Sequence, residues 1–170
     1  MLTAERAQDL LAYDPETGAF SWRASRRGVR PGVCGRVSKA HGYHEICVDS
    51  RLYRAQRLAF LLMAGELPPP DLDVDHINGD KADNRWANLR LATRAQNATN
   101  AKQRAHSASP VHGVTWDAGR GKWRAQIRID GRKVNLGRYE TIEAARRAYA
   151  AASITHHGAF APSHVSACAA

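Results

Sequence analysis

An aspartate followed directly by a histidine, Asp75-His76, is the pair of residues in this chain best suited to chemistry. A carboxylate can bind a divalent metal, and an imidazole has a pKa near neutrality and can accept a proton from water. Asn88 and Asn97 follow in the same polar stretch and add amide oxygens, which together with carboxylates and water suit Mg²⁺. A metal held in this way withdraws charge from a phosphate and stabilises a leaving alkoxide. The stretch from 74 to 97 therefore predicts metal-assisted hydrolysis of phosphodiesters.

The elements that must position these residues are two strands and a helix. Residues 72–76 form a predicted short strand, and residues 89–92 alternate apolar and polar side chains as a second strand does. Between them lies a polar loop rich in turn-forming residues. Thr93 with Gln96 three residues later is a capping-box pattern, so we expect a helix to begin there and to carry Asn97 in its first or second turn.

This stretch resembles the core of the HNH endonucleases, in the variant with Asn at the last position, and its pattern is close to that of phage and intron homing enzymes. The resemblance rests on Asp75-His76-Ile77-Asn78-Gly79-Asp80, Asp83-Asn84-Arg85, Asn88-Leu89-Arg90 and Asn97. It implies a ββα-metal core over 71–104 with one divalent ion, Mg²⁺ or Mn²⁺. It assigns Asp75 and Asn97 as metal ligands, His76 as the catalytic general base, Asn88 as the catalytic residue that fixes the loop, and Arg85 and Arg90 as DNA contacts. Gln56 stands where relatives commonly have a histidine.

The residues before the core, 1–70, are predicted to form a β-rich region that leads into the nuclease. We expect a helix from a Thr3 cap through Leu11, a turn over 14–18 and a strand over 19–23. A basic, glycine-rich loop over 26–35, a hairpin of 43–48 with 52–54, and an apolar helix over 57–63 that ends before Gly65 and three prolines complete it.

A second unit over 113–162 follows a polar stretch, with the linker placed at 105–112. Strands are predicted over 112–117, 122–130 and 132–139, with Asp130-Gly131 as a tight turn between the last two. Thr141 is the expected N-cap of a helix to about His156, which Gly158 ends. Apolar side chains at alternate positions from 123 to 129 should pack on this helix.

The second unit resembles the plant ethylene-response-factor (Apetala-type, AP2/ERF) DNA-binding domain, whose three-stranded sheet, backed by one helix, enters the major groove. The resemblance rests on Gly113-Val114-Thr115-Trp116, Lys122-Trp123-Arg124-Ala125-Gln126-Ile127, Leu136-Gly137-Arg138-Tyr139 and Glu143-Ala144-Ala145-Arg146-Arg147-Ala148-Tyr149. It implies DNA contacts by Thr115, Gln126, Arg128, Lys133 and Asn135, and Arg120, Arg124 and Trp116 are further candidates for DNA contact. Asn135 stands where plant members usually have Trp, so base preference does not transfer.

The composition fits a protein that works on nucleic acid. The 170 residues carry a formal net charge of +9 and a pI of about 10.0, a surplus typical of nucleic-acid binders. Three cysteines without CxxC spacing indicate neither a disulfide framework nor a zinc knuckle. Neither a signal peptide nor a membrane helix is evident, so the expected setting is the cytoplasm of a bacterial or phage-infected cell, close to the nucleoid.

Together these patterns predict an α+β protein that is a site-specific DNA endonuclease of the homing type. We expect it to use one divalent metal, to nick one strand of double-stranded DNA per monomer, and to require neither a membrane nor an obligate protein partner. Two alternatives remain at this stage. One is a sequence-specific DNA-binding regulator with an inactive nuclease core, and the other is a basic RNA- or ribosome-associated protein.

Overall fold

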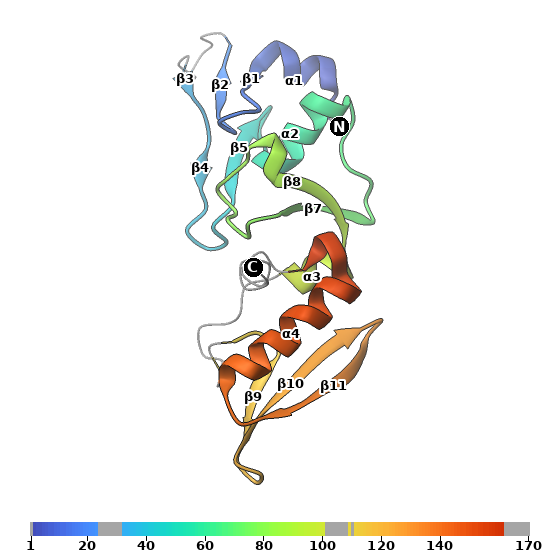
Figure 1. Cartoon of the computed structure of the whole chain (residues 1–170). Helices are drawn as coiled ribbons and strands as arrows, with labels where there is room; N and C mark the ends of the chain where they lie inside the picture. Colours follow the sequence, from blue (N-terminus) through green and yellow to red (C-terminus); the bar gives the residue numbers. More distant parts are fainter. Residues whose placement is uncertain (1, 24–31, 101–108, 110, 162–170) are drawn as a thin grey trace. The chain divides into compact units, whose positions relative to one another are not determined.

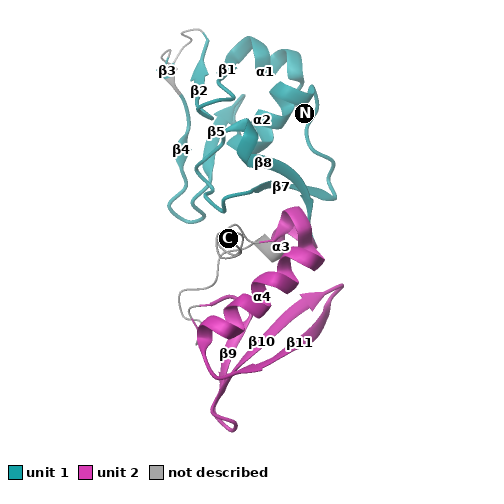
Figure 2. Ribbon diagram, in the orientation of Figure 1, with its two compact units in different colours: residues 1–94 teal, residues 95–170 magenta. Residues whose placement is uncertain are grey.

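The computed structural model describes residues 2–23, 32–100, 109 and 111–161. The chain divides into two compact units, unit 1 over residues 1–94 and unit 2 over residues 95–170 (Figure 2). Each unit has its own cluster of buried apolar side chains. Most of the predicted linker, and the greater part of the predicted glycine-rich loop, lie outside the described residues.

Unit 1 begins with α1 (Ala4–Leu10), which Thr3 caps by accepting a hydrogen bond from the Arg6 N–H at 3.2 Å. The chain then forms β1 (Leu11–Tyr13) and β2 (Phe20–Trp22), an antiparallel pair extended by β3 (Gly32–Val33). The predicted helix is therefore one residue too long, because Leu11 already pairs with Trp22. The turn predicted between β1 and β2 is confirmed by a hydrogen bond from the Gly18 N–H to the Asp14 carbonyl at 2.8 Å.

The second sheet of unit 1 contains the predicted hairpin. It consists of β4 (Arg36–Val37), β5 (His44–Val48) and β6 (Arg51–Arg54). Asp49 and Ser50 form the turn between β5 and β6 with positive φ angles of 46° and 63°, as the favoured two-residue hairpin turn requires. Helix α2 (Ala55–Ala64) follows directly and ends at Gly65, whose φ is 82°.

The segment from residue 72 to residue 100, which contains Asp75 and His76, has the predicted order of elements. Strand β7 (Leu72–His76) pairs antiparallel with β8 (Leu89–Thr93), and a loop that ends in the 3-10 turn η1 (Trp86–Asn88) connects them. Helix α3 (Arg94–Asn100) continues from β8. Buried apolar side chains from α2 and from both strands, among them Leu58, Val74 and Leu89, belong to the core of unit 1, so the loop stands on a packed base.

Unit 2 contains the predicted three-stranded sheet and helix, which confirms the predicted fold class. Strands β9 (Val114–Asp117), β10 (Lys122–Ile129) and β11 (Arg132–Tyr139) pair antiparallel with β10 in the centre. Helix α4 (Ile142–His157) lies across one face of this sheet (Figure 1) and is followed by the turn η2 (Gly158–Phe160). Ala125 and Ile127 pack there against Ala145 and Tyr149.

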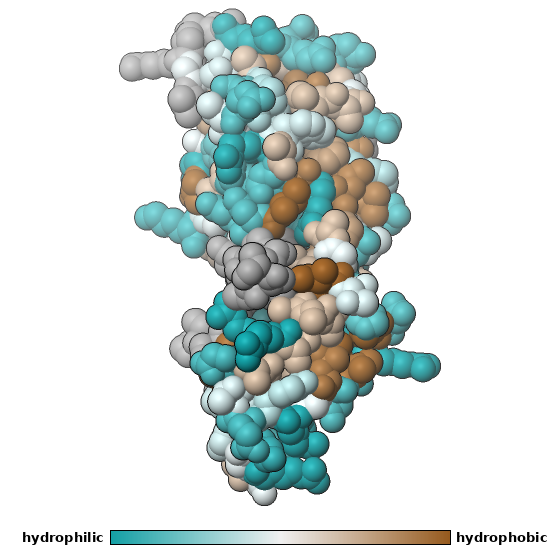
Figure 3. All heavy atoms as spheres, viewed as in Figure 1, coloured by the Kyte–Doolittle hydropathy of each residue, from teal (hydrophilic) through white to brown (hydrophobic). Residues whose placement is uncertain are grey.

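The sheet of unit 2 has one irregularity that the sequence did not indicate. The β10–β11 register shifts between Ala125, which pairs with Gly137, and Gln126, which pairs with Asn135. Leu136 is thus the extra residue of a β-bulge, and bulges locally increase the twist of a strand. The end of unit 2 that carries the β9–β10 turn is covered by hydrophilic residues in the view of Figure 3. No helix among the described residues has the length and apolar character needed to cross a membrane.

Candidate active site and nucleic-acid interface

Asp75 and His76 lie at the end of β7 and are both largely buried, with 6% and 4% of their surface exposed. The strand register places Asp75 opposite Arg90 of β8. The Arg90 guanidinium donates two hydrogen bonds to Oδ2 of Asp75, at 2.9 Å from Nε and 2.6 Å from Nη2. A charge-assisted pair of this kind fixes the orientation of the carboxylate. It also gives Arg90 a partner inside the protein, so its predicted contact with phosphate stays a prediction.

His76 is held by a residue to which the sequence assigned no role. Its Nε2 lies 3.3 Å from Oδ1 of Asn84, and Asn84 is 1% exposed. The Asn84 side chain is itself oriented, because its Nδ2 donates to the Ala82 carbonyl at 3.0 Å. Burial lowers the pKa of His76 below its ordinary value, although the Asn84 hydrogen bond and the charge of Asp75 oppose this shift. The neutral imidazole, the form that can accept a proton, therefore predominates at neutral pH.

Asn88 spans the loop between the two strands. Its Oδ1 accepts from the Asn78 N–H at 3.0 Å, and its Nδ2 donates to Oδ1 of Asn78 at 3.0 Å and to the Asp83 carbonyl at 2.8 Å. Three hydrogen bonds from one largely buried amide join the two ends of the loop. This geometry suits the loop-fixing role expected for Asn88, while its effect on catalysis stays a prediction.

The acidic side chain of the loop, Asp83, is engaged by neighbours on both sides. Arg85 donates from Nε at 2.8 Å and from Nη2 at 2.6 Å, and Asn78 donates from Nδ2 at 2.7 Å. The hydrogen bonds from Arg85 hold the pKa of Asp83 at about 2. Arg85 therefore has an internal partner as Arg90 does, and its predicted DNA contact also stays a prediction.

The N-terminal turn supports the end of this loop. The Tyr13 hydroxyl donates to the Asn84 carbonyl at 2.8 Å, and the Trp86 N–H donates to the Pro15 carbonyl at 2.9 Å. A Cβ added at Gly18, where φ is 73°, would lie 2.5 Å from the Arg85 nitrogen. Only glycine allows the two backbones to approach this closely. The sequence predicted the turn but not its contact with the loop, because nothing local links residues so far apart in the chain.

The predicted metal donors have the chemistry that Mg²⁺ or Mn²⁺ requires. Asp75 offers a carboxylate on β7, and Asn97 offers an amide from α3, where it is half-buried within unit 2. Among the described residues no three His, Cys, Asp or Glu side chains come together as a metal-binding group. A metal at Asp75 would therefore need amide oxygens and water to complete its ligand shell, as Mg²⁺ commonly does. The role of Asn97 as a ligand stays a prediction.

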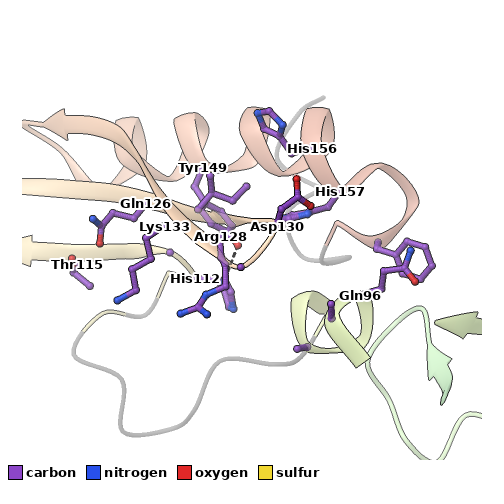
Figure 4. A pocket seen from close by; sticks show the side chains of 16 residues that line it. Gln96, His112, Thr115, Gln126, Arg128, Asp130, Lys133, Tyr149, His156 and His157 are labelled. Atoms are coloured by element: carbon purple, nitrogen blue, oxygen red, sulfur yellow. Dashed lines mark hydrogen bonds between the residues drawn. The ribbon is translucent and has the colours of Figure 1, made fainter. Parts of the chain in front are cut away.

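In unit 2 the predicted DNA contacts lie on neighbouring strands. Arg128 pairs with Lys133, Gln126 with Asn135, and Arg124 with Thr115. Alternation along β10 directs these side chains away from the face that packs on α4. We call this set of six residues the reading face. Figure 4 shows four of them around a hollow of about 830 Å³, together with His112, whose Nδ1 lies 2.7 Å from the buried Tyr149 hydroxyl.

Two predicted contacts lie outside the reading face. Trp116 pairs with Trp123 rather than with a polar residue, and their rings meet edge to face at 5.1 Å. It therefore belongs to the face that carries α4, although 49% of its surface is exposed. Arg120 is exposed in the β9–β10 turn, where its N–H donates to the Asp117 carbonyl at 3.1 Å. Contact of these two residues with DNA stays a prediction.

The chain combines a strand–loop–strand–helix segment, β7 to α3, with a module of three strands and one helix, β9 to α4. Comparison with protein families agrees: residues 53–99 match the HNH endonuclease family and residues 109–158 match the AP2 domain. The chain thus has one segment similar to the HNH endonuclease family, followed by one similar to AP2 domains.

Two individual proteins are similar to parts of this chain. Protein 3.8 of Escherichia phage T7 is 29% identical over 75 residues, which are 44% of this chain and 62% of that protein. The solved structure of the HNH homing endonuclease I-HmuI, described as showing DNA binding and cleavage, matches with 25% identity and a TM-score of 0.41. That match covers 54% of this chain and 51% of the other. The chain therefore spans less than two thirds of the length of either relative.

Proposed function

We propose that this protein is a site-specific, metal-dependent endonuclease of the homing type that acts on double-stranded DNA. The observation that carries the proposal is the buried Asp75-His76 pair at the end of β7, beside a loop closed by Asn88. The family matches support a DNA nuclease with a DNA-binding domain. The proposal includes a single bound metal, a specific DNA target and action inside a bacterial or phage-infected cell.

In the proposed reaction His76 accepts a proton from a water molecule. The water oxygen forms a bond to phosphorus while the bond from phosphorus to the leaving sugar oxygen breaks. Burial keeps the imidazole neutral and ready for this step. Asn84 orients the ring through Nε2, and Asn88 holds the loop beside it. A divalent ion held by Asp75 and Asn97 would withdraw charge from the phosphate and stabilise the leaving oxygen.

The division of labour between the units follows from their side chains. The reading face offers Arg and Lys, which pair with guanine or phosphate, and Gln and Asn, which pair with adenine. Phosphate contacts would give most of the affinity and a strong salt dependence, and base contacts would give the specificity. Because the family match finds one HNH-type core in the chain, we propose that a monomer nicks a single strand.

The experiment is a plasmid-relaxation assay with the wild-type chain and His76→Ala, in EDTA, Mg²⁺ or Mn²⁺. The plasmid carries the genomic region around the gene, so that a target is included. Nicked circles that require metal and disappear in His76→Ala support the proposal. Linear product from a single-target plasmid at low enzyme concentration would overturn the nicking step alone.

A second candidate function is a DNA-binding regulator with an inactive nuclease core. The Asp75–Arg90 pair favours it, because the carboxylate expected to bind metal already holds a guanidinium at 2.6 Å. Removing Arg90 would leave Asp75 open to metal. If the wild type binds duplex tightly but fails to nick in any metal while Arg90→Ala gains nicking, the regulator becomes the better description.

A further inference from the structure

Two cationic side chains of unit 1 lie against one aromatic ring beside His76. The Arg54 guanidinium carbon is 4.3 Å from the centre of the Tyr43 ring, and the Lys81 Nζ is 4.7 Å from the same point. The Tyr43 and His76 rings lie 6.1 Å apart, centre to centre, within the range of aromatic pairs. We call Tyr43, Arg54 and Lys81 the Tyr43 cluster. It joins the β4–β5 turn, the end of β6 and the nuclease loop.

The two cations of this cluster differ from Arg85 and Arg90 in the partners that they bind. Arg85 and Arg90 each hold a carboxylate, Asp83 and Asp75. In the part of the chain that the structure describes, neither cation of the Tyr43 cluster forms a salt bridge. Lys81 Nζ instead donates to the carbonyl of His41 at 3.0 Å, a neutral partner. Both side chains are exposed, and so are able to meet an anion from solvent.

Because Arg54 and Lys81 lie 4.3 Å and 4.7 Å from the same ring centre, their positive charges must also lie close to each other. Each gains about 0.5–1 kcal/mol from the ring at an exposed site, but neither gains from the other, because like charges repel. An anion bound between them would attract each cation and so offset their mutual repulsion. Arg and Lys are the side chains that bind phosphate, the arginine through its planar fork and the lysine as a point charge.

We propose that the Tyr43 cluster is a binding site for the sugar-phosphate backbone of the DNA strand that is cleaved. It seats a phosphate next to His76, so that the scissile bond meets the base in register. The proposal rests on the proposed function for the identity of the strand, but the phosphate contact itself can be measured without cleavage. The Tyr43 ring acts as a positioning residue, since it holds both cations and contacts the His76 ring.

The competing explanation is a purely structural one. Lys81 also connects the β4–β5 turn to the nuclease loop, so the cluster could serve only to fasten these two segments. A fastening role predicts lower thermal stability on removal of Lys81 and no change in the salt dependence of DNA binding. A phosphate site predicts unchanged thermal stability and a weaker salt dependence of DNA binding on removal of Lys81. Stability is unchanged because exposed cation–ring contacts contribute little to it.

The test compares Arg54→Ala and Lys81→Ala in the full chain with two matched controls that remove the same charge. Arg51→Ala changes an exposed arginine of the same strand β6, and Lys39→Ala changes an exposed lysine in the β4–β5 turn. Binding to a 30-base-pair duplex is measured in EDTA from low to moderate salt. Any duplex serves as the probe, because the phosphate term does not depend on sequence. Thermal melting of each variant is recorded alongside.

For each cluster variant we expect the slope of log affinity against log salt to fall by about 0.9, the value for one lost phosphate contact. The controls should change the slope by less than a third of that, and melting should be unaltered. Lys81→Arg, which keeps the charge, should restore the wild-type slope. Slopes in the cluster variants equal to those in the controls would overturn the proposal, whether or not melting falls.

Cleavage separates this inference from the proposed function. If the wild type nicks DNA, single-turnover rates at saturating enzyme should drop at least tenfold in the cluster variants and stay within twofold in the controls. Reduced slopes in the cluster variants, without nicking by the wild type, would support the phosphate site and contradict the proposed nuclease activity. Normal nicking by the cluster variants, with unchanged slopes, would support the nuclease activity and contradict the phosphate site.

Discussion

Asn88→Ala tests whether the amide that spans the nuclease loop holds it together. The substitution removes three hydrogen bonds, one accepted from Asn78 and two donated to Asn78 and Asp83. Each such bond contributes about 0.5–1.5 kcal/mol net. Asn78 is exposed and Asp83 half-buried, so water can replace much of what their groups lose. Three such bonds would contribute about 1.5–4.5 kcal/mol together. We therefore expect the free energy of unfolding to fall by about 2 kcal/mol, in the lower half of the range for three bonds.

The assay is scanning calorimetry, which resolves separate transitions if the two units melt independently. For a chain of this size, about 1 kcal/mol moves the melting temperature by ~2–4 °C, so the shift should be ~4–8 °C. A double-mutant cycle with Asn78→Ala isolates the side-chain bond between the two asparagines and should give a coupling of about 1 kcal/mol. Nicking at saturating enzyme should also fall, by up to about 30-fold if the full 2 kcal/mol reaches the transition state.

If the free energy of unfolding of Asn88→Ala lies within about 0.5 kcal/mol of the wild-type value, Asn88 does not hold the loop together. Ordinary surface substitutions have effects of this size. A coupling energy near zero would contradict this role of Asn88 equally. The melting of unit 2 serves as the control, because Asn88 lies in unit 1 and unit 2 has its own core.

Three further results are expected. Gly113→Ala should destabilise unit 2 by more than about 2 kcal/mol, since its Cβ would lie 2.1 Å from the Tyr149 ring at a φ of 71°. Gly121 has a φ of 61° and open space around it. Gly121→Ala should therefore cost only about 1 kcal/mol in the same melting assay. The Arg85–Asp83 pair should stabilise the fold fully above the unfolded pKa near 3.8 and lose this contribution as pH falls toward about 2, so acid unfolding of Asp83→Asn should show a weaker pH dependence over that window. Chelation of divalent metal should abolish nicking and leave duplex binding intact, and a nuclease that cuts in excess EDTA would contradict the metal requirement.

The sequence predicted the elements of the active region well because their signals are local. Alternation, the capping pattern at Thr93 and the Asp130-Gly131 turn each depend on a few neighbouring residues. Strands β1, β3 and β4 were missed because two or three residues carry no periodic pattern. Helix α2 begins two residues before the predicted start, since its first turn packs as part of the core and lacks a side-chain cap to mark it.

The contacts within the site could not be predicted, because they depend on pairing across the chain. The Asp75–Arg90 pair follows only from the β7–β8 register, and the contact of Asn84 with His76 depends on the path of a loop. The bulge at Leu136 and the face occupied by Trp116 likewise became visible only with the strand pairs in place. One sequence signal could have drawn attention to Asn84: it is one of three asparagines, with Asn78 and Asn88, that closely follow the Asp75-His76 pair.

The contact between the N-terminal turn and the loop between β7 and β8 limits how the HNH-like segment could be transplanted into another protein. The family-matched segment starts at residue 53, yet Tyr13, Pro15 and Gly18 support the loop from outside it. A nuclease cassette cut at that boundary and fused to another DNA-binding module would leave the loop without this support. A transplant that keeps the chain from residue 2 to 100 retains every one of these contacts, together with Asn97, the proposed metal ligand on α3. The portable unit for engineering is therefore about twice as long as the motif by which it is recognised.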